Sequence, residues 1–311
     1  MSDLFCVKLE GTVLLKVIQH CQDTDATAIG QLIGLESSNS LEVTNCFPLP
    51  SNSSIGPQEL EDYSRIMCKQ LKDLYFENSV IGWYQRSDEG EFLDISSIEY
   101  QYNMQIEIPN AVMVVYDPVL LVSGGFPLKA YRLTQEFLDF FSDEEFTTQR
   151  AASLGVNSKT VFTEIPLRIE NSMVTNAFLA QYAPDPYEVT DKDCFEPFIK
   201  KHLEAIEQGL DELLERQQKL YGYTKAVQKQ KQQQKFHEAQ REAENKKREE
   251  RGEPLLDLTE GTGSLYRPIQ PPSRLESLLV SQQLNTLGEE LGEFCGESQA
   301  KVDLFISLGQ K

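Results

Sequence analysis

The stretch Val80–Ser87 constrains the fold of this chain more than any other. It runs Val-Ile-Gly-Trp-Tyr-Gln-Arg-Ser and carries the only tryptophan among the 311 residues. An apolar pair, a glycine that lets a neighbouring backbone approach, and two aromatic residues predict a buried strand that ends at a surface. In α/β sheets, side chains at such strand ends face the crevice where ligands bind. Gln85 and Ser87 are therefore the first candidate site residues.

This strand belongs to a mixed pattern of strands and helices over residues 1–170. Alternating or continuous apolar runs predict strands at 5–9, 28–35, 41–47, 112–116, 128–133 and 162–169, and we expect the second and third to form a hairpin. Apolar residues at spacings of three and four predict helices at 13–18, 57–76 and 94–106. A turn is expected at 117–118, and residues 135–160 are expected to be polar and irregular. The sequence therefore predicts one α/β domain over residues 1–170.

The rest of the chain has a mainly helical pattern. We expect a helical region over 171–251 that ends in a basic Gln/Lys-rich segment, a proline-containing linker over 252–272, and an amphipathic helix over 273–311. The apolar face of this last helix is formed by Leu275, Leu278, Leu279, Leu284, Leu287, Leu291 and Phe294. Such a face most often packs within its own chain, but the linker favours docking into a helical bundle with partner proteins.

Charge is unevenly distributed along the chain. The total is −20, whereas residues 216–251 hold eleven Lys or Arg against five Glu. The chain as a whole repels phosphate, so any RNA contact must be local to 216–251. The alternative is a solvated helix or a disordered segment, which the interrupting glutamates favour.

Several classes of protein are not indicated. No apolar run is long enough to span a bilayer, and the first residues lack the pattern of a secretory signal, so we expect a cytoplasmic protein. The six cysteines form no C-x-x-C pair, which argues against a zinc knuckle or a redox motif. No glycine pattern of a nucleotide-binding loop occurs. We expect no cofactor.

Three short motifs resemble the MPN domain, a JAMM-like fold of the cytidine-deaminase-like class. They are Gly82-Trp83-Tyr84, Ile29–Gly34 and Tyr116-Asp117-Pro118. The resemblance implies a family that includes zinc isopeptidases, whose JAMM motif combines a glutamate, His-x-His and Ser-x-x-Asp. In such sites three protein ligands hold zinc and the glutamate is the general base.

Carried onto this chain, the JAMM motif is degenerate. The two histidines fall on Gln85 and Ser87, and the glutamate falls on Thr27. The downstream serine and aspartate fall on one of three pairs, depending on loop length: Ile95 and Ile98, Asp94 and Ser97, or Ser96 and Glu99. None restores the missing imidazoles, so we expect no metal and no catalysis. A zinc isopeptidase with a degenerate site is the remote alternative.

Sequence blocks both outside and inside this domain resemble a narrower family, and those outside it are the most specific. Arg251–Pro254 and Pro271–Leu279, together with Thr44–Pro48 and Leu128–Leu133, are similar to the H subunits of eukaryotic translation initiation factor 3. This implies a non-catalytic scaffold that pairs with the MPN domain of the F subunit, joins the helical bundle of the factor, and supports initiation on the small ribosomal subunit. The alternative is an inactive MPN subunit of the proteasome lid or of the signalosome.

Overall fold

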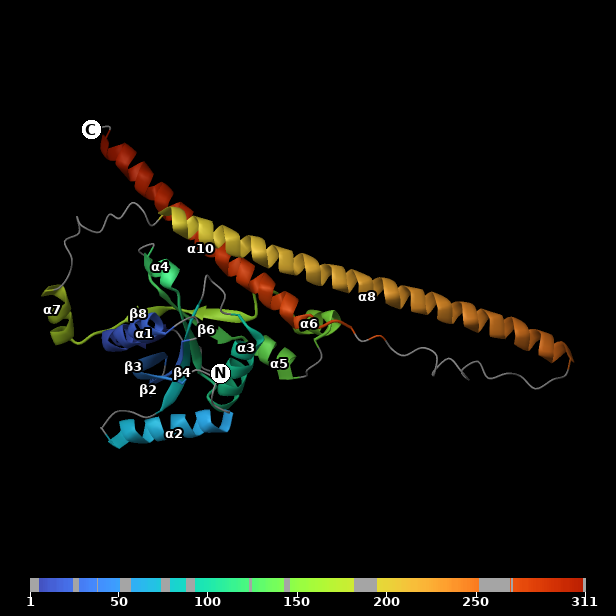
Figure 1. Cartoon of the computed structure of the whole chain (residues 1–311), viewed down its shortest axis with the longest axis horizontal. Helices are drawn as coiled ribbons and strands as arrows, with labels where there is room; N and C mark the ends of the chain where they lie inside the picture. Colours follow the sequence, from blue (N-terminus) through green and yellow to red (C-terminus); the bar gives the residue numbers. More distant parts are fainter. Residues whose placement is uncertain are drawn as a thin grey trace.

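A computed structural model describes residues 6–24, 28–37, 39–50, 57–73, 79–87, 93–122, 125–142, 146–181, 195–251, 269 and 271–309. A sheet is covered by helices on both faces, and two long helices lie across one side of it (Figure 1). Within the described residues the sheet has eight strands in the order β7-β6-β5-β4-β2-β3-β1-β8. These strands are β1 (Cys6–Leu9), β2 (Ile29–Glu36), β3 (Ser40–Pro48), β4 (Val80–Arg86), β5 (Val112–Tyr116), β6 (Leu128–Leu133), β7 (Phe162–Ile165) and β8 (Leu167–Ile169).

The predicted tryptophan strand, β4, is confirmed and lies near the middle of the sheet. It pairs antiparallel with β2 and parallel with β5, and β2 pairs antiparallel with β3 as the predicted hairpin. Trp83 and Tyr84 are each 1% exposed. A side chain at Gly82 would collide with the backbone carbonyl of Val112, so the glycine lets β4 and β5 approach.

The prediction of one strand over 162–169 is wrong, because Pro166 divides the segment into β7 and β8. Proline has no N–H to donate to a strand ladder. β7 pairs with β6 at one edge of the sheet, whereas β8 pairs with β1 at the other. Since one residue separates the two edge strands, the sheet must curl until its edges approach each other.

Helices cover the two faces of the sheet with separate cores. Helix α1 (Gly11–Asp23) packs on the face that includes Tyr84, and α3 (Ile95–Glu107) packs on the face that includes Trp83. Helix α2 (Pro57–Asp73) covers a smaller cluster around Phe47 at the β2-β3 hairpin.

The prediction that residues 135–160 are irregular is wrong. They include α5 (Gln135–Ser142) and α6 (Thr148–Leu154), and Phe137 and Phe140 on α5 are fully buried. At eight and seven residues, these helices are too short to show a repeating apolar stripe among their polar neighbours. The expected turn at 117–118 leads into a further short helix, α4 (Pro118–Val122).

Three helices follow the sheet. They are α7 (Met173–Gln181), α8 (Phe195–Arg251) and α10 (Leu275–Gly309). α8 and α10 contact each other across the domain, and the outer part of α8 continues far beyond it (Figure 1). A side chain at Gly209 on α8 would press against Leu284 on α10, which marks a close approach of the two helices. Of the predicted linker 252–272, all but residues 269, 271 and 272 lie outside the described residues. Within the part of the chain that the structure describes, no helix combines the length and apolar character needed to cross a bilayer.

Candidate functional site

The candidate site lies at the end of β4, on the face of the sheet that carries Trp83. Because strand side chains alternate, Gln85 and Ser87 share this face. Both are buried, at 6% and 1% exposure. They occupy the strand end that the sequence analysis identified as the candidate site.

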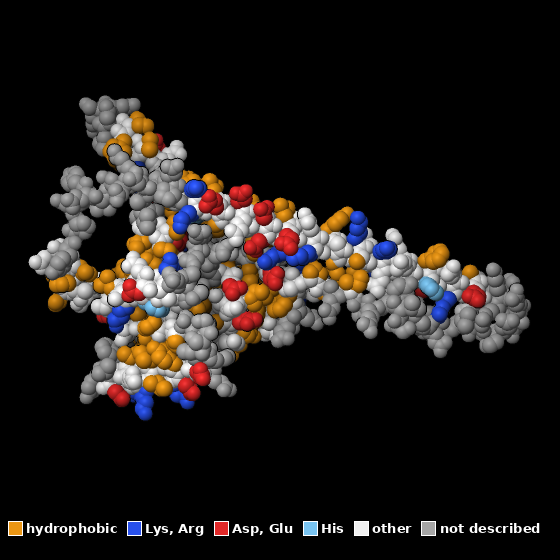
Figure 2. All heavy atoms as spheres, viewed as in Figure 1, with side chains coloured by type: hydrophobic (Ala, Val, Ile, Leu, Met, Phe, Trp, Pro, Cys, Tyr) orange, Lys and Arg blue, Asp and Glu red, His pale blue; other side chains and the backbone are white. Residues whose placement is uncertain are grey.

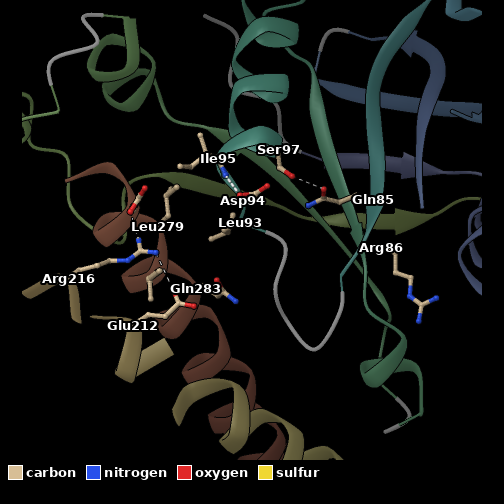
Figure 3. Close-up of a pocket in the computed structure, with 12 residues that line it drawn as sticks. Gln85, Arg86, Leu93, Asp94, Ile95, Ser97, Glu212, Arg216, Leu279 and Gln283 are labelled. Carbon is tan, nitrogen blue, oxygen red and sulfur yellow. Dashed lines mark hydrogen bonds and ion pairs between the residues drawn. The ribbon is translucent and has the colours of Figure 1, made fainter. Parts of the chain in front are cut away.

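Gln85 is joined to α3 by a side-chain hydrogen bond. The Ser97 hydroxyl donates to Gln85 Oε1 over 3.0 Å (Figure 3). Asp94 caps the start of the same helix by accepting from the Ile95 backbone N–H over 2.8 Å. This geometry favours the register in which Asp94 and Ser97 stand at the serine and aspartate positions of the JAMM motif, whereas Ile98 is fully buried in the core. Thr27, the glutamate position, lies outside the described residues.

These side chains do not fit a zinc ion. Gln85 and Ser97 offer a neutral amide and a neutral hydroxyl that already bond to each other, whereas zinc sites use thiolate, imidazole and carboxylate ligands. Ser87 lines a different, small cavity with Asp117 and Lys129. Among the described residues no group of three or more His, Cys, Asp or Glu side chains could hold a metal.

A cavity of about 470 Å³ opens beside Gln85 and Ser97, and both long helices form walls of it (Figure 3). α10 contributes Leu279 and Gln283, and α8 contributes Arg216. Arg216 forms ion pairs with Glu212 of α8 at 3.3 Å and Glu276 of α10 at 3.4 Å. The crevice in which an isopeptidase would work is therefore partly closed by the chain's own helices.

A buried charge cluster, here called the Glu290 latch, fastens the helices to the domain. Glu290 on α10 accepts a hydrogen bond from Lys129 Nζ of β6 at 2.9 Å and contacts His202 Nε2 of α8 at 3.3 Å. His202 is 3% exposed, and its other ring nitrogen contacts the Phe198 carbonyl oxygen at 3.1 Å. Three elements distant in sequence thus meet at one carboxylate.

Titration of the latch follows from its burial and its partners. Burial raises the pKa of Glu290, but hydrogen bonds and charge from His202 and Lys129 outweigh it, so the net pKa is below the ordinary value. For Lys129, burial lowers the pKa and Glu290 more than restores it, so the net pKa is raised. Burial also raises the pKa of nearby Asp117, against a backbone hydrogen bond from Val119. No short sequence motif marks His202 or Glu290.

The apolar face of the last helix packs on its own chain in this structure. Leu275, Leu279 and Leu287 are at most 4% exposed, and Leu275 and Leu279 belong to the core cluster of Trp83. Phe294 stacks near Phe198 of α8, with ring centroids 4.3 Å apart. The remaining face residues are partly buried, namely Leu278, Leu284 and Leu291. The expectation that this face covers a partner is corrected accordingly, because the domain and α8 occupy it.

Other apolar side chains remain exposed. On α8, Leu203, Leu210, Leu214 and Tyr221 are 50–65% exposed. Helix α7 and the end of α10 have exposed apolar residues as well, which are Met173, Val174, Phe178 and Leu179, and Val302, Leu304, Phe305 and Ile306. Figure 2 shows hydrophobic side chains among charged ones along α8. Large contiguous patches of exposed apolar surface are a common feature of protein contact sites, whereas single exposed apolar residues are normal.

The fold defines an MPN-domain protein, and the described side chains at its candidate site do not fit a zinc ion. Residues 2–110 match the family model described as JAB1/Mov34/MPN/PAD-1 ubiquitin protease, and residues 122–311 match that of the C-terminal region of eIF3h.

Curated relatives extend the match over nearly the whole chain. The H subunit of eukaryotic translation initiation factor 3 in Nematostella vectensis is 32% identical, with 98% of this chain and 94% of the relative covered. The H subunit of Dictyostelium discoideum is 32% identical, with 99% of this chain and 95% of the relative covered. That of Arabidopsis thaliana is 30% identical, with 97% of this chain and 92% of the relative covered. The chain belongs to the family of H subunits of eukaryotic translation initiation factor 3. The resemblance inferred from the sequence blocks is confirmed.

Proposed function

We propose that this chain is a non-catalytic docking subunit of translation initiation factor 3 in the cytoplasm, where it supports initiation on the small ribosomal subunit. Membership of the family of H subunits supports a role in the factor, and favours it over the proteasome lid or signalosome. The neutral side chains at the zinc-ligand positions support a role without hydrolysis.

The observation that carries the docking role is an exposed apolar stripe on α8. Leu203, Leu210, Leu214 and Tyr221 follow one another at intervals of seven, four and seven residues, which keeps them within about 40° of one line along a helix. The other side of α8 faces α10 through Phe198 and Gly209. A third helix, supplied by another subunit, would bury the stripe and extend the pair into a bundle.

Substitution of the stripe tests this proposal. The triple variant Leu203→Gln, Leu210→Gln, Leu214→Gln keeps good helix formers and removes the apolar surface. Co-expressed subunits of the factor should no longer co-purify with it. The matched control is Glu204→Gln, Glu207→Gln, Glu215→Gln, which alters three exposed side chains of the same helix and should co-purify normally. Unchanged co-purification of the leucine variant would contradict docking through this stripe.

Pairing with the MPN domain of the F subunit is assigned to a different surface, at α7. Met173 and Val174 are 90% and 80% exposed, and Phe178 is 59% exposed. Asn171 accepts a 2.7 Å hydrogen bond from the Gly11 N–H, so α7 and α1 start at one corner of the domain. The variant Met173→Gln, Val174→Thr, Phe178→Gln should lose the F subunit and keep the subunits that bind α8. Loss of both together, or of neither, would refute the division into two surfaces.

A further inference from the structure

The net charge of the side chains on helix α8 changes from negative to positive along its length. Its inner part, beside the domain, exposes a group of carboxylates, namely Glu204, Glu207, Asp211, Glu212 and Glu215. From residue 216 to residue 237 there is no acidic residue and there are six Lys or Arg. In Figure 2 the acidic side chains gather where α8 overlies the domain, and Lys and Arg follow further out. The part of α8 from residue 222 to residue 235 is here called the arm.

Four lysines form the centre of the arm. Lys225, Lys229, Lys231 and Lys235 are all exposed. At 1.5 Å and 100° per residue, they span about 15 Å along the helix and about 160° around it. Lys225 lies over the ring of Tyr221, with Nζ 5.4 Å from the centroid. The other three make no ion pair within the described part of the chain, whereas Arg216 and Lys219 are paired to glutamates one turn earlier.

The composition of the arm distinguishes between kinds of partner. Every residue from 228 to 235 is Gln or Lys, so this stretch has no apolar anchor of the kind that forms the centre of a protein interface. Lysine cations and amide donors are the groups that contact phosphates and sugars without regard to sequence. The arm therefore suits a nucleic-acid backbone better than a protein surface.

We propose that the arm binds the phosphate backbone of RNA through Lys225, Lys229, Lys231 and Lys235. The carboxylates of inner α8 repel phosphate, so RNA is held at the outer end of the helix and kept away from the domain. The binding is expected to be independent of base sequence, because phosphate contacts carry no sequence information and the exposed aromatic residues that flank the arm, Tyr221 and Phe236, would stack on any base. A flexible single strand can follow lysines that are spread around half of the helix.

Binding of a labelled 20-nucleotide oligouridylate to the full chain, measured by fluorescence anisotropy, tests this inference. Four phosphate contacts to a single strand predict a slope of about −2.8 for log K against log salt, or about 50-fold weaker binding at 200 mM than at 50 mM salt. The variant Lys225→Gln, Lys229→Gln, Lys231→Gln, Lys235→Gln should lose binding and most of the slope. Its circular dichroism should stay unchanged, since glutamine is also a good helix former.

A second variant controls for net charge. Lys69→Gln, Lys72→Gln, Lys200→Gln, Lys301→Gln removes the same total charge from exposed sites outside the arm, and should bind RNA as the parent chain does. Equal weakening by the two variants, or no measurable binding by the parent chain, would overturn the proposal. Equally tight binding of polyglutamate would overturn it in favour of an acidic protein partner. The assay uses the chain alone, so its outcome is independent of docking to other subunits.

Discussion

Loss of the Glu290 carboxylate should detach the long helices from the domain at a measurable cost in stability. Glu290 is 9% exposed at its side chain and bonds to Lys129 and His202, which are themselves 23% and 3% exposed. Glu290→Ala removes the carboxylate that Lys129 Nζ and His202 Nε2 contact. Glu290→Gln keeps one oxygen for Lys129 and a polar amide group beside His202, so it should be milder.

The magnitudes follow from the burial of the partners. Removing one member of a fully buried ion pair costs about 3–5 kcal/mol, and a hydrogen bond to a charged group contributes about 1.5–3 kcal/mol. Because Lys129 can partly regain water, we expect Glu290→Ala to lower the free energy of unfolding by about 3 kcal/mol. For Glu290→Gln we expect a loss of about 1 kcal/mol.

Urea unfolding followed by Trp83 fluorescence gives the measurement, since the tryptophan shares a core cluster with Leu275 and Leu279 of α10. The matched control is the adjacent Glu289→Ala, whose ion pair with Lys159 at 3.7 Å is about 70% exposed and should contribute about 0.5 kcal/mol or less. If Glu290→Ala were as stable as Glu289→Ala, the latch would not hold the helices and the reasoning from burial would be refuted.

The same variants predict a pH dependence. The folded-state pKa of Glu290 lies below its unfolded value, so its stabilisation is complete above the unfolded pKa and is lost as pH falls through the folded pKa. The stability difference between the parent chain and Glu290→Gln should therefore shrink in acid, below about pH 4. Lys129 has a raised pKa, so it affects stability at alkaline pH. Its stabilising contribution is present below the unfolded-state pKa and is lost as pH rises through the folded-state pKa. If the stability difference between the parent chain and Glu290→Gln stayed constant below about pH 4, a lowered pKa of Glu290 in the folded state would be contradicted.

Three further outcomes are expected. Gly82→Ala should destabilise the chain by about 1–3 kcal/mol in urea unfolding, since the added methyl group meets the Val112 carbonyl; an unchanged midpoint would contradict the close packing of β4 on β5. Phe137→Ala should cost about 3–5 kcal/mol through cavity formation, whereas the exposed Glu136→Ala should be near neutral; similar effects of the two would contradict the burial of α5. The purified chain should contain no stoichiometric zinc by elemental analysis and cleave no ubiquitin linkage, because neutral side chains occupy the ligand positions; bound zinc at one per chain would contradict this.

The sequence was sufficient for features that depend on local pattern. Val80–Arg86 combines apolar, aromatic and glycine residues in an order that only a buried strand accommodates, and the structure confirms it. The placement of Gln85 and Ser87 at the zinc-ligand positions comes from the resemblance to the JAMM motif and stays a prediction. The sequence left three downstream registers open because the length of the loop before α3 was unknown, and the contact between Ser97 and Gln85 favours the register of Asp94 and Ser97.

Features that depend on tertiary contacts were missed. The leucine face of α10 has the same spacing whether a partner or its own domain covers it, so periodicity could not show that Leu279 packs beside the Trp83 cluster. The Glu290 latch joins residues separated by 88 and 161 positions, and no local pattern links such residues. Two sequence signals could have corrected the fold prediction. Pro166 inside the predicted strand 162–169 indicated a break, and the aromatic residues of α5 indicated a buried element.

Affinity purification of the full chain from cytoplasmic extract, followed by quantitative mass spectrometry, shows whether the chain docks into the initiation factor through α8. Translation initiation factor 3 subunits should be recovered in near-equal amounts with the parent chain and with the variant Glu204→Gln, Glu207→Gln, Glu215→Gln. They should be depleted with Leu203→Gln, Leu210→Gln, Leu214→Gln. Recovery of proteasome lid or signalosome subunits in their place, or undiminished recovery with the leucine variant, would contradict a docking subunit of the initiation factor that binds through α8.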